Sequence, residues 1–173
     1  TLGGRFELVQ HVWLSSSAGS TEFVAGESIP MTMQWSGLES ALLQYTQAET
    51  LVLRLPHSVN GAILEDASSS EDGIMRLYSS SVQFAPIEFV NPGGKLIVLF
   101  ENASATLQTI STDPGFSGEV ISGNVGISLS ETTIAENEES GAIVGQFSTV
   151  YPDVNNQFEY AFVSGEGDND NSH

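Results

Sequence analysis

The sequence contains no cysteine and only four basic residues, Arg5, Arg54, Arg76 and Lys95, against 22 aspartates and glutamates in 173 residues. The lack of cysteine excludes a disulfide scaffold, a cysteine-ligated zinc site and a thiol nucleophile. The formal charge of −18 argues against nucleic-acid or anionic-lipid binding, because both depend on clustered Lys and Arg. No apolar run approaches the roughly 20 residues that a membrane-spanning helix needs.

Sequence patterns of catalysis are also lacking. The chain has no Gly-x-Ser-x-Gly, no His-Glu-x-x-His and no phosphate-binding loop. His11 falls in an expected strand and His57 follows a proline in an expected turn, which favours structural roles over metal or catalytic ones. With 22 acids some pair of carboxylates is inevitable, so a pair alone does not indicate a glycosidase. We therefore expect that the protein is not an enzyme.

What the sequence does contain is a β pattern along most of its length. Apolar residues alternate or form short runs, and Gly, Ser, Asn and Pro separate them at short intervals. The predicted strands are Phe6–Leu14, Ser28–Trp35, Thr50–Leu55, Gly73–Tyr78, Gln83–Val90, Lys95–Phe100, Gly118–Ile121, Gly126–Ser130, Ala142–Ser148 and Gln157–Val163.

Two segments give more detailed expectations. Lys95–Phe100 is apolar at both even and odd positions, which predicts a central strand buried on both faces, launched by the turn residues Asn91–Gly94. Leu38–Gln47 is the one segment with a short helical apolar face, and we expect a helical turn there that crosses one end of a sandwich.

The first strands resemble the opening of an immunoglobulin-type sandwich. The segment that carries this resemblance is Phe23-Val-Ala-Gly-Glu-Ser-Ile-Pro-Met-Thr-Met-Gln-Trp35, a turn followed by an alternating strand that ends in a tryptophan. A tryptophan behind such a strand is typical of a core. If Trp13, Trp35 or Tyr78 were instead exposed on one face, they would indicate a sugar-stacking platform.

The C-terminal quarter resembles another family. It contains Ile127-Ser-Leu-Ser-Glu-Thr-Thr-Ile-Ala-Glu-Asn137, then Gly141-Ala-Ile-Val-Gly145, Tyr151-Pro-Asp153 and Phe158-Glu-Tyr-Ala-Phe-Val-Ser-Gly165, followed by Gly167-Asp-Asn-Asp-Asn171. These blocks are similar to the start of the bacterial cadherin-like repeats found in secreted and cell-surface adhesins. The resemblance covers residues 127–171, and its blocks are individually short.

The resemblance implies calcium as a cofactor. In that family the ions lie at the ends of each repeat and bind hard carboxylate oxygens, which calcium prefers. Glu136 matches the acid of the family's Glu-Asn block and Asp153 matches the second acid of its Asp-Pro-Asp block. Tyr151 stands where the first acid of that block is expected, so the implied site has one carboxylate fewer.

A second set of candidate calcium ligands comes from the residues themselves. Glu65-Asp66 and Glu71-Asp72 flank three serines, and paired acids with hydroxyls offer the oxygen ligands of a calcium loop. The spacing differs from an EF-hand, and a solvated hairpin loop explains the same residues. The sequence leaves both alternatives open.

These observations predict an all-β fold: an antiparallel, immunoglobulin-like β-sandwich over residues 1–122, followed by a partial cadherin-like module over residues 123–173. A partial module leaves strand edges and half a core uncovered. Its strands could belong to a longer protein, could complete the sheet of the first domain, or could pair with a neighbouring chain by strand addition.

The function that we expect from this organisation is structural or adhesive. The protein would be extracellular or on the cell surface, in a matrix or a filament, and would self-associate or receive a neighbouring chain through strand pairing. A carbohydrate-binding module of a secreted protein is the alternative. No nucleic-acid partner and no membrane insertion are expected.

Overall fold

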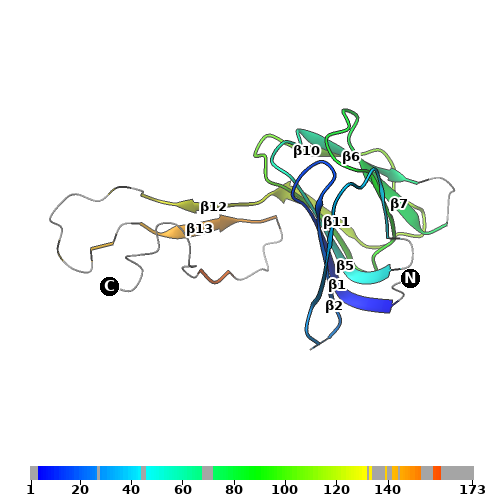
Figure 1. Ribbon diagram of the computed structural model, residues 1–173, viewed down its shortest axis with the longest axis horizontal. Helices are drawn as coiled ribbons and strands as arrows, with labels where there is room; N and C mark the ends of the chain where they lie inside the picture. The colour runs from blue at the N-terminus through cyan, green and yellow to red at the C-terminus, as the bar shows by residue number, and fades with distance from the viewer. Residues whose placement is uncertain are drawn as a thin grey trace.

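The computed structural model describes residues 4–26, 28–43, 46–67, 72–131, 133, 139, 142–143, 145–152 and 158–160. Within these residues the chain forms thirteen strands and no helix. Eleven of the strands form two sheets that pack as a sandwich, and the last two form a hairpin that reaches away from it (Figure 1). The prediction of an all-β sandwich is confirmed.

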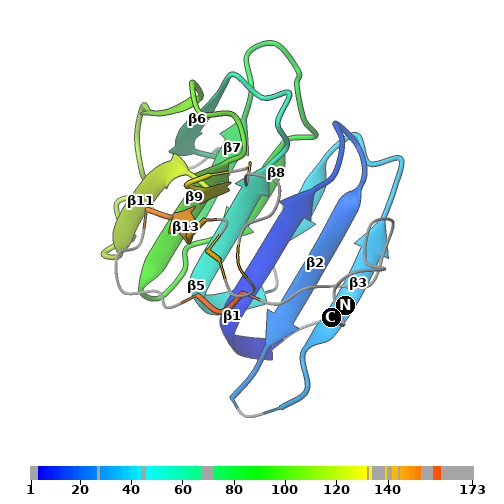
Figure 2. The same ribbon diagram turned by 90° about the vertical axis from the view of Figure 1, so that its left-hand side faces the viewer.

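The first sheet has six strands in the order β11-β9-β5-β1-β2-β3. They are β1 (Gly4–Trp13), β2 (Gly19–Val24), β3 (Met31–Trp35), β5 (Thr46–Leu55), β9 (Lys95–Phe100) and β11 (Glu119–Asn124). Figure 2 shows β5, β1, β2 and β3 side by side across this sheet.

The second sheet has five strands in the order β10-β6-β7-β8-β4. They are β4 (Ala41–Leu43), β6 (Gly61–Asp66), β7 (Ile74–Tyr78), β8 (Ile87–Val90) and β10 (Thr106–Thr109). The strands β6, β7 and β8 bury every second residue, which is the period expected of a strand with one face on a core.

The strand pairing differs from the antiparallel pattern that we expected. The four strands β11, β9, β5 and β1 are mutually parallel, and β10 with β6 and β4 with β8 are parallel as well. The reason is the path of the chain: after β5 it forms β6, β7 and β8 in the opposite sheet, and it then returns beside β5 in the same direction as β9. Each such excursion is the long connection that parallel neighbours require.

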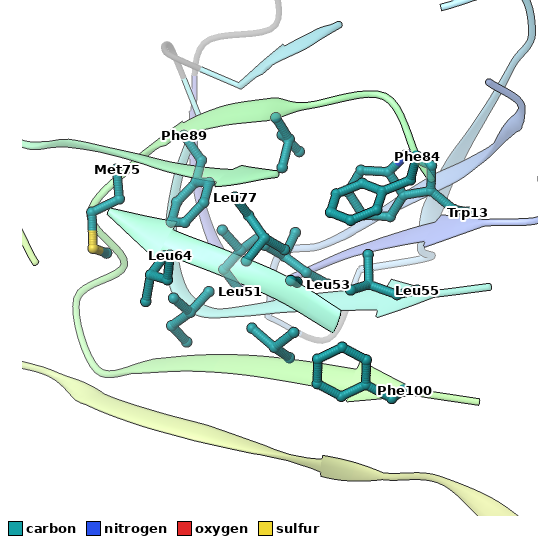
Figure 3. Close-up of a cluster of buried hydrophobic side chains, with 14 of the residues drawn as sticks. Trp13, Leu51, Leu53, Leu55, Leu64, Met75, Leu77, Phe84, Phe89 and Phe100 are labelled. Atoms are coloured by element: carbon teal, nitrogen blue, oxygen red, sulfur yellow. The ribbon is translucent and has the colours of Figure 1, made fainter. Parts of the chain in front are cut away.

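The core lies between the two sheets. Figure 3 shows Leu53, Leu77, Phe84 and Phe89 directed into one cluster, with Trp13 beside Phe84. The rings of Trp13 and Phe84 meet edge to face with centroids 5.3 Å apart. Burying each aliphatic or phenylalanine side chain contributes roughly 1.5–3 kcal/mol, so this cluster dominates the stability of the fold.

Strand β9 is central, as its apolar sequence predicts. It pairs with β5 on one side and β11 on the other, and Leu96 to Phe100 are all buried. Leu96, Val98 and Phe100 belong to the main core. Ile97 and Leu99 face the outside of the sheet, where Val52 and Tyr151 help to cover them.

The helical turn expected over Leu38–Gln47 is wrong. Ala41–Leu43 forms β4, which pairs with β8, and β5 already begins at Thr46. A ten-residue segment gains little as a helix on its own, whereas a strand here extends both sheets through backbone hydrogen bonds.

The third sheet is the hairpin β12 (Gly126–Leu129) and β13 (Phe147–Val150). β13 begins five residues later than the strand predicted from Ala142, and the described residues Phe158–Tyr160 of the last predicted strand are not in a strand. The predicted boundary after residue 122 falls within β11, which ends at Asn124. The division into 1–122 and 123–173 stays a prediction.

Candidate functional site

The two calcium ligands implied by the cadherin-like resemblance, Glu136 and Asp153, lie outside the described residues. Their neighbour Tyr151 is described. It packs against the outer cluster of the first sheet, and its ring centroid lies 5.7 Å from that of Phe158. The position where the family has an acid is therefore used here for apolar packing.

The acidic candidates in the sandwich come together at one end of the second sheet. Asp66 ends β6, Asp72 precedes β7, and Asp113 lies in the loop between β10 and β11. One carboxylate oxygen of each lies within 4.8 Å of the others, and this is the one group of three or more potential metal ligands in the described part of the chain. Glu71 and the three serines lie outside that part.

Asp113 is the fixed point of this arrangement. Its side chain is 1% exposed. Its Oδ1 accepts hydrogen bonds from the Asn91 side-chain amide and the Gly115 backbone N–H, each at 2.8 Å, and its Oδ2 accepts one from the Gly73 N–H at 3.1 Å. The three donors come from three loops, so the buried Asp113 side chain ties these loops together.

Backbone hydrogen bonds fix the segments that carry the other two acids, one within a turn and one between elements distant in sequence. The Ile74 backbone N–H donates to Asp72 Oδ1 at 2.9 Å across Gly73, whose φ of 76° suits glycine. The Asp66 backbone N–H donates to the Ser111 hydroxyl at 3.1 Å, which ties β6 to the loop that carries Asp113.

Two side-chain oxygens at this end are buried without a hydrogen-bond partner, namely Asp66 Oδ1 and Asn91 Oδ1. Desolvation by the surrounding protein raises the pKa of the Asp66 carboxyl, and the negative charges of Asp113 and Asp72 raise it further. The arrangement therefore concentrates negative charge where oxygen atoms lack donors.

The tryptophans do not form an exposed platform. Trp13 is 1% exposed in the core, and Trp35 is half-buried, with its Nε1–H donating to the Thr21 hydroxyl at 3.2 Å. His11 stacks on Trp35 at 4.7 Å between ring centroids and lies 2.6 Å from Thr21 Oγ1 through its Nδ1. His11 is thus a buried strand residue and His57 a turn residue, as predicted.

The hairpin is apolar on one face. Register places Ile127 opposite Thr149 and Leu129 opposite Phe147, so these four side chains share a face, whereas Ser128 and Ser148 meet on the other at 2.7 Å between hydroxyls. Tyr160 stacks on Phe147 with centroids 5.2 Å apart. Ile127 is 69% exposed and Phe147 43%. The face is covered only in part.

Comparisons with known proteins add no relative. No family model matches the chain, and neither a curated protein nor a solved structure matches it. Among the described residues, no helix is long and apolar enough to cross a lipid bilayer.

Sequence reasoning found Asp66 and Asp72 but missed Asp113 and Asn91. Asn91 lies in the segment Asn91–Gly94, which the sequence predicts as a turn, and Asp113 directly precedes the turn-forming pair Pro114-Gly115. An acid or amide directly before a Pro-Gly pair was the available signal, but the partners lie 22 to 40 residues apart in sequence and meet only through the sheet order.

Proposed function

We propose that this protein is a non-enzymatic structural or adhesive protein of the cell surface, matrix or a filament, and that it assembles through β-strand pairing at the hairpin β12–β13. The observation that carries the proposal is the hairpin itself: among the described residues its two strands pair only with each other. A two-stranded sheet is marginally stable in water, and its outer edges offer unpaired backbone groups to another chain.

The side chains of the hairpin support the same conclusion. β12 and β13 carry no charged residue, although the chain as a whole has a formal charge of −18. Copies of such a chain repel each other, and a neutral segment with exposed Ile127 and Phe147 is where a neighbour approaches at least electrostatic cost. Salt should therefore promote assembly by screening the repulsion.

The location outside the cell and calcium binding at Glu136 and Asp153 are parts of this proposal. They are supported by the resemblance of residues 127–171 to cadherin-like repeats of surface adhesins. Both fit an acidic β-sandwich whose sequence contains no catalytic pattern.

Replacing Ile127 and Phe147 together with aspartate should abolish assembly of the full chain, because it places two charges on the apolar face of the hairpin. The measurement is sedimentation velocity over a range of protein concentrations at 0.15 M salt. A chain that ends before Gly126 should also stay monomeric while its sandwich remains folded by circular dichroism.

The matched control is Leu14→Asp with Val82→Asp, which adds the same charge at two apolar side chains that are 75% and 77% exposed on sandwich loops. This control should assemble like the unmodified protein. A monomeric unmodified chain at every concentration, or assembly that survives the hairpin substitutions, would refute the proposal.

Carbohydrate binding is the second candidate, and one observation favours it. A groove of about 440 Å³ is lined by Arg54, Tyr151, Phe158 and Tyr160 beside the start of β12. Aromatic ring faces with a nearby charged side chain suit a sugar ring. The candidate sugar-binding surface is therefore this groove and not a tryptophan platform, because Trp13 is buried in the core.

On that alternative, Tyr160→Ala should lose its retardation by soluble polysaccharides such as hydroxyethylcellulose or glycol chitin, because a stacking ring is removed. Tyr160→Phe keeps the ring and should retain most of the binding. Affinity electrophoresis of the two variants compares them directly. Equal migration of the unmodified chain with and without every polysaccharide would remove this candidate.

A further inference from the structure

The acidic end of the sandwich has a property that the hairpin and its assembly do not explain. Asp66, Asp72 and Asp113 bring three carboxylates within 4.8 Å, and two oxygens beside them, Asp66 Oδ1 and Asn91 Oδ1, are buried without a donor. We infer that these four side chains form a binding site for a divalent cation of the calcium class, which joins the loops at this end of the sandwich.

The separations fit a calcium ion. If all three oxygen–oxygen separations had the upper value of 4.8 Å, an ion at their centre would lie about 2.8 Å from each oxygen. Calcium binds oxygen ligands at roughly 2.3–2.6 Å in flexible geometry, so small side-chain movements complete the contact. Magnesium requires about 2.0–2.1 Å and near-ideal octahedral geometry, so ligands that come from four separate segments suit calcium, with its flexible geometry, better.

Asn91 is the independent evidence for a ligand. It is not part of the acidic cluster, yet its amide N–H donates to Asp113 Oδ1 at 2.8 Å, which places the Asn91 amide group next to that carboxylate. That oxygen is buried and has no hydrogen-bond partner. A buried amide oxygen without a donor is unfavourable, and a neutral amide oxygen is a ligand that calcium commonly takes.

A buried carboxylate oxygen also lacks a positively polarised partner. Asp66 Oδ1 is buried without a hydrogen-bond partner, and the Asp66 side chain lies near the carboxylates of Asp72 and Asp113. A proton on Asp66 would relieve only part of this repulsion, because it removes one of the three negative charges. A divalent cation neutralises the group and gives each orphan oxygen a positive neighbour.

The ion would act as a cross-link. Its ligands come from the end of β6, the segment before β7, the segment after β8 and the loop between β10 and β11. Asp113 already holds three of these segments together through Gly73, Asn91 and Gly115. Binding should therefore stabilise the sandwich, and the stabilisation should grow with the logarithm of the free calcium concentration once that exceeds the dissociation constant.

The test uses the full chain with CaCl₂, MgCl₂ or EDTA, followed by isothermal titration calorimetry and thermal unfolding. Calcium should raise the melting temperature, and magnesium should do so less. Asp66→Asn and Asp72→Asn should each weaken calcium binding to the sandwich by about tenfold or more. Asp72→Asn keeps an oxygen that can accept from the Ile74 N–H, so its fold is expected to persist.

A comparison in EDTA keeps the test decisive. Without metal, removing one negative charge relieves repulsion, so Asp66→Asn should be at least as stable as the unmodified chain. With calcium present, Asp66→Asn should be the less stable of the two, because it binds the stabilising ion more weakly. The exposed Glu39→Gln serves as the charge-matched control and should change neither result. The inference is overturned if calcium leaves the unmodified chain unchanged, or if both variants bind it as tightly as the unmodified chain, which would place the ion elsewhere.

Discussion

Replacing Leu53 with alanine is expected to lower the free energy of unfolding by about 2–5 kcal/mol. Leu53 lies in β5, between β1 and β9, and its side chain is 0% exposed. Figure 3 shows it at the middle of the cluster that joins the two sheets. The loss has two parts, the apolar surface that is no longer buried and the cavity that the rigid strands around it cannot close.

Urea unfolding followed by circular dichroism measures this change, and Leu14→Ala is the matched control. Leu14 is 75% exposed just after β1, so the same truncation there should change the free energy by no more than about 0.5 kcal/mol. Equal effects at the two positions would mean that the sandwich core does not lie where the structure places it.

Acidification is expected to destabilise the sandwich through His11. Burial lowers the pKa of the His11 imidazole from 6.5 to about 3, and its Nε2 has no hydrogen-bond partner. Since the folded-state pKa lies below the unfolded one, the unfolded chain binds the proton first. The stabilisation is complete above pH 6.5 and is lost as the pH falls toward 3, with a slope of up to roughly 1.4 kcal/mol per pH unit.

Many carboxylates titrate in the lower part of the same window, so the contribution of His11 is measured as a difference between variants. His11→Gln should show a smaller fall in unfolding free energy between pH 6.5 and 4 than the unmodified chain. His57→Gln changes the turn histidine and should keep the original slope. Identical slopes in all three proteins would show that His11 is not buried as a neutral imidazole.

The sequence was most informative where burial is complete. Lys95–Phe100 is apolar on both faces, and it became β9, the strand with neighbours on both sides. Strands β2, β6 and β10 were missed because their sequences are interrupted by Gly, Ser, Thr and acids, and they become strands through pairing with neighbours. Parallel pairing was not predictable, because it depends on which sheet each segment joins.

The candidate sites also combine features that local sequence predicts with features that depend on the tertiary fold. Asp66 and Asp72 are close in sequence, and their pattern of paired acids raised calcium as one of two alternatives. Asp113 and Asn91 complete the group only because loops from different strands meet at one end of the second sheet. The hairpin was predicted as an open β segment, but which of its residues share the apolar face followed from the register alone.

Hydrogen–deuterium exchange of the full chain at low and high protein concentration tests the central claim most directly. If chains pair through the hairpin, the backbone amides of β12 and β13 should exchange quickly in the dilute sample and become protected in the concentrated one, while those of β5 and β9 stay protected throughout. Hairpin amides that exchange equally fast at both concentrations would contradict assembly by strand pairing.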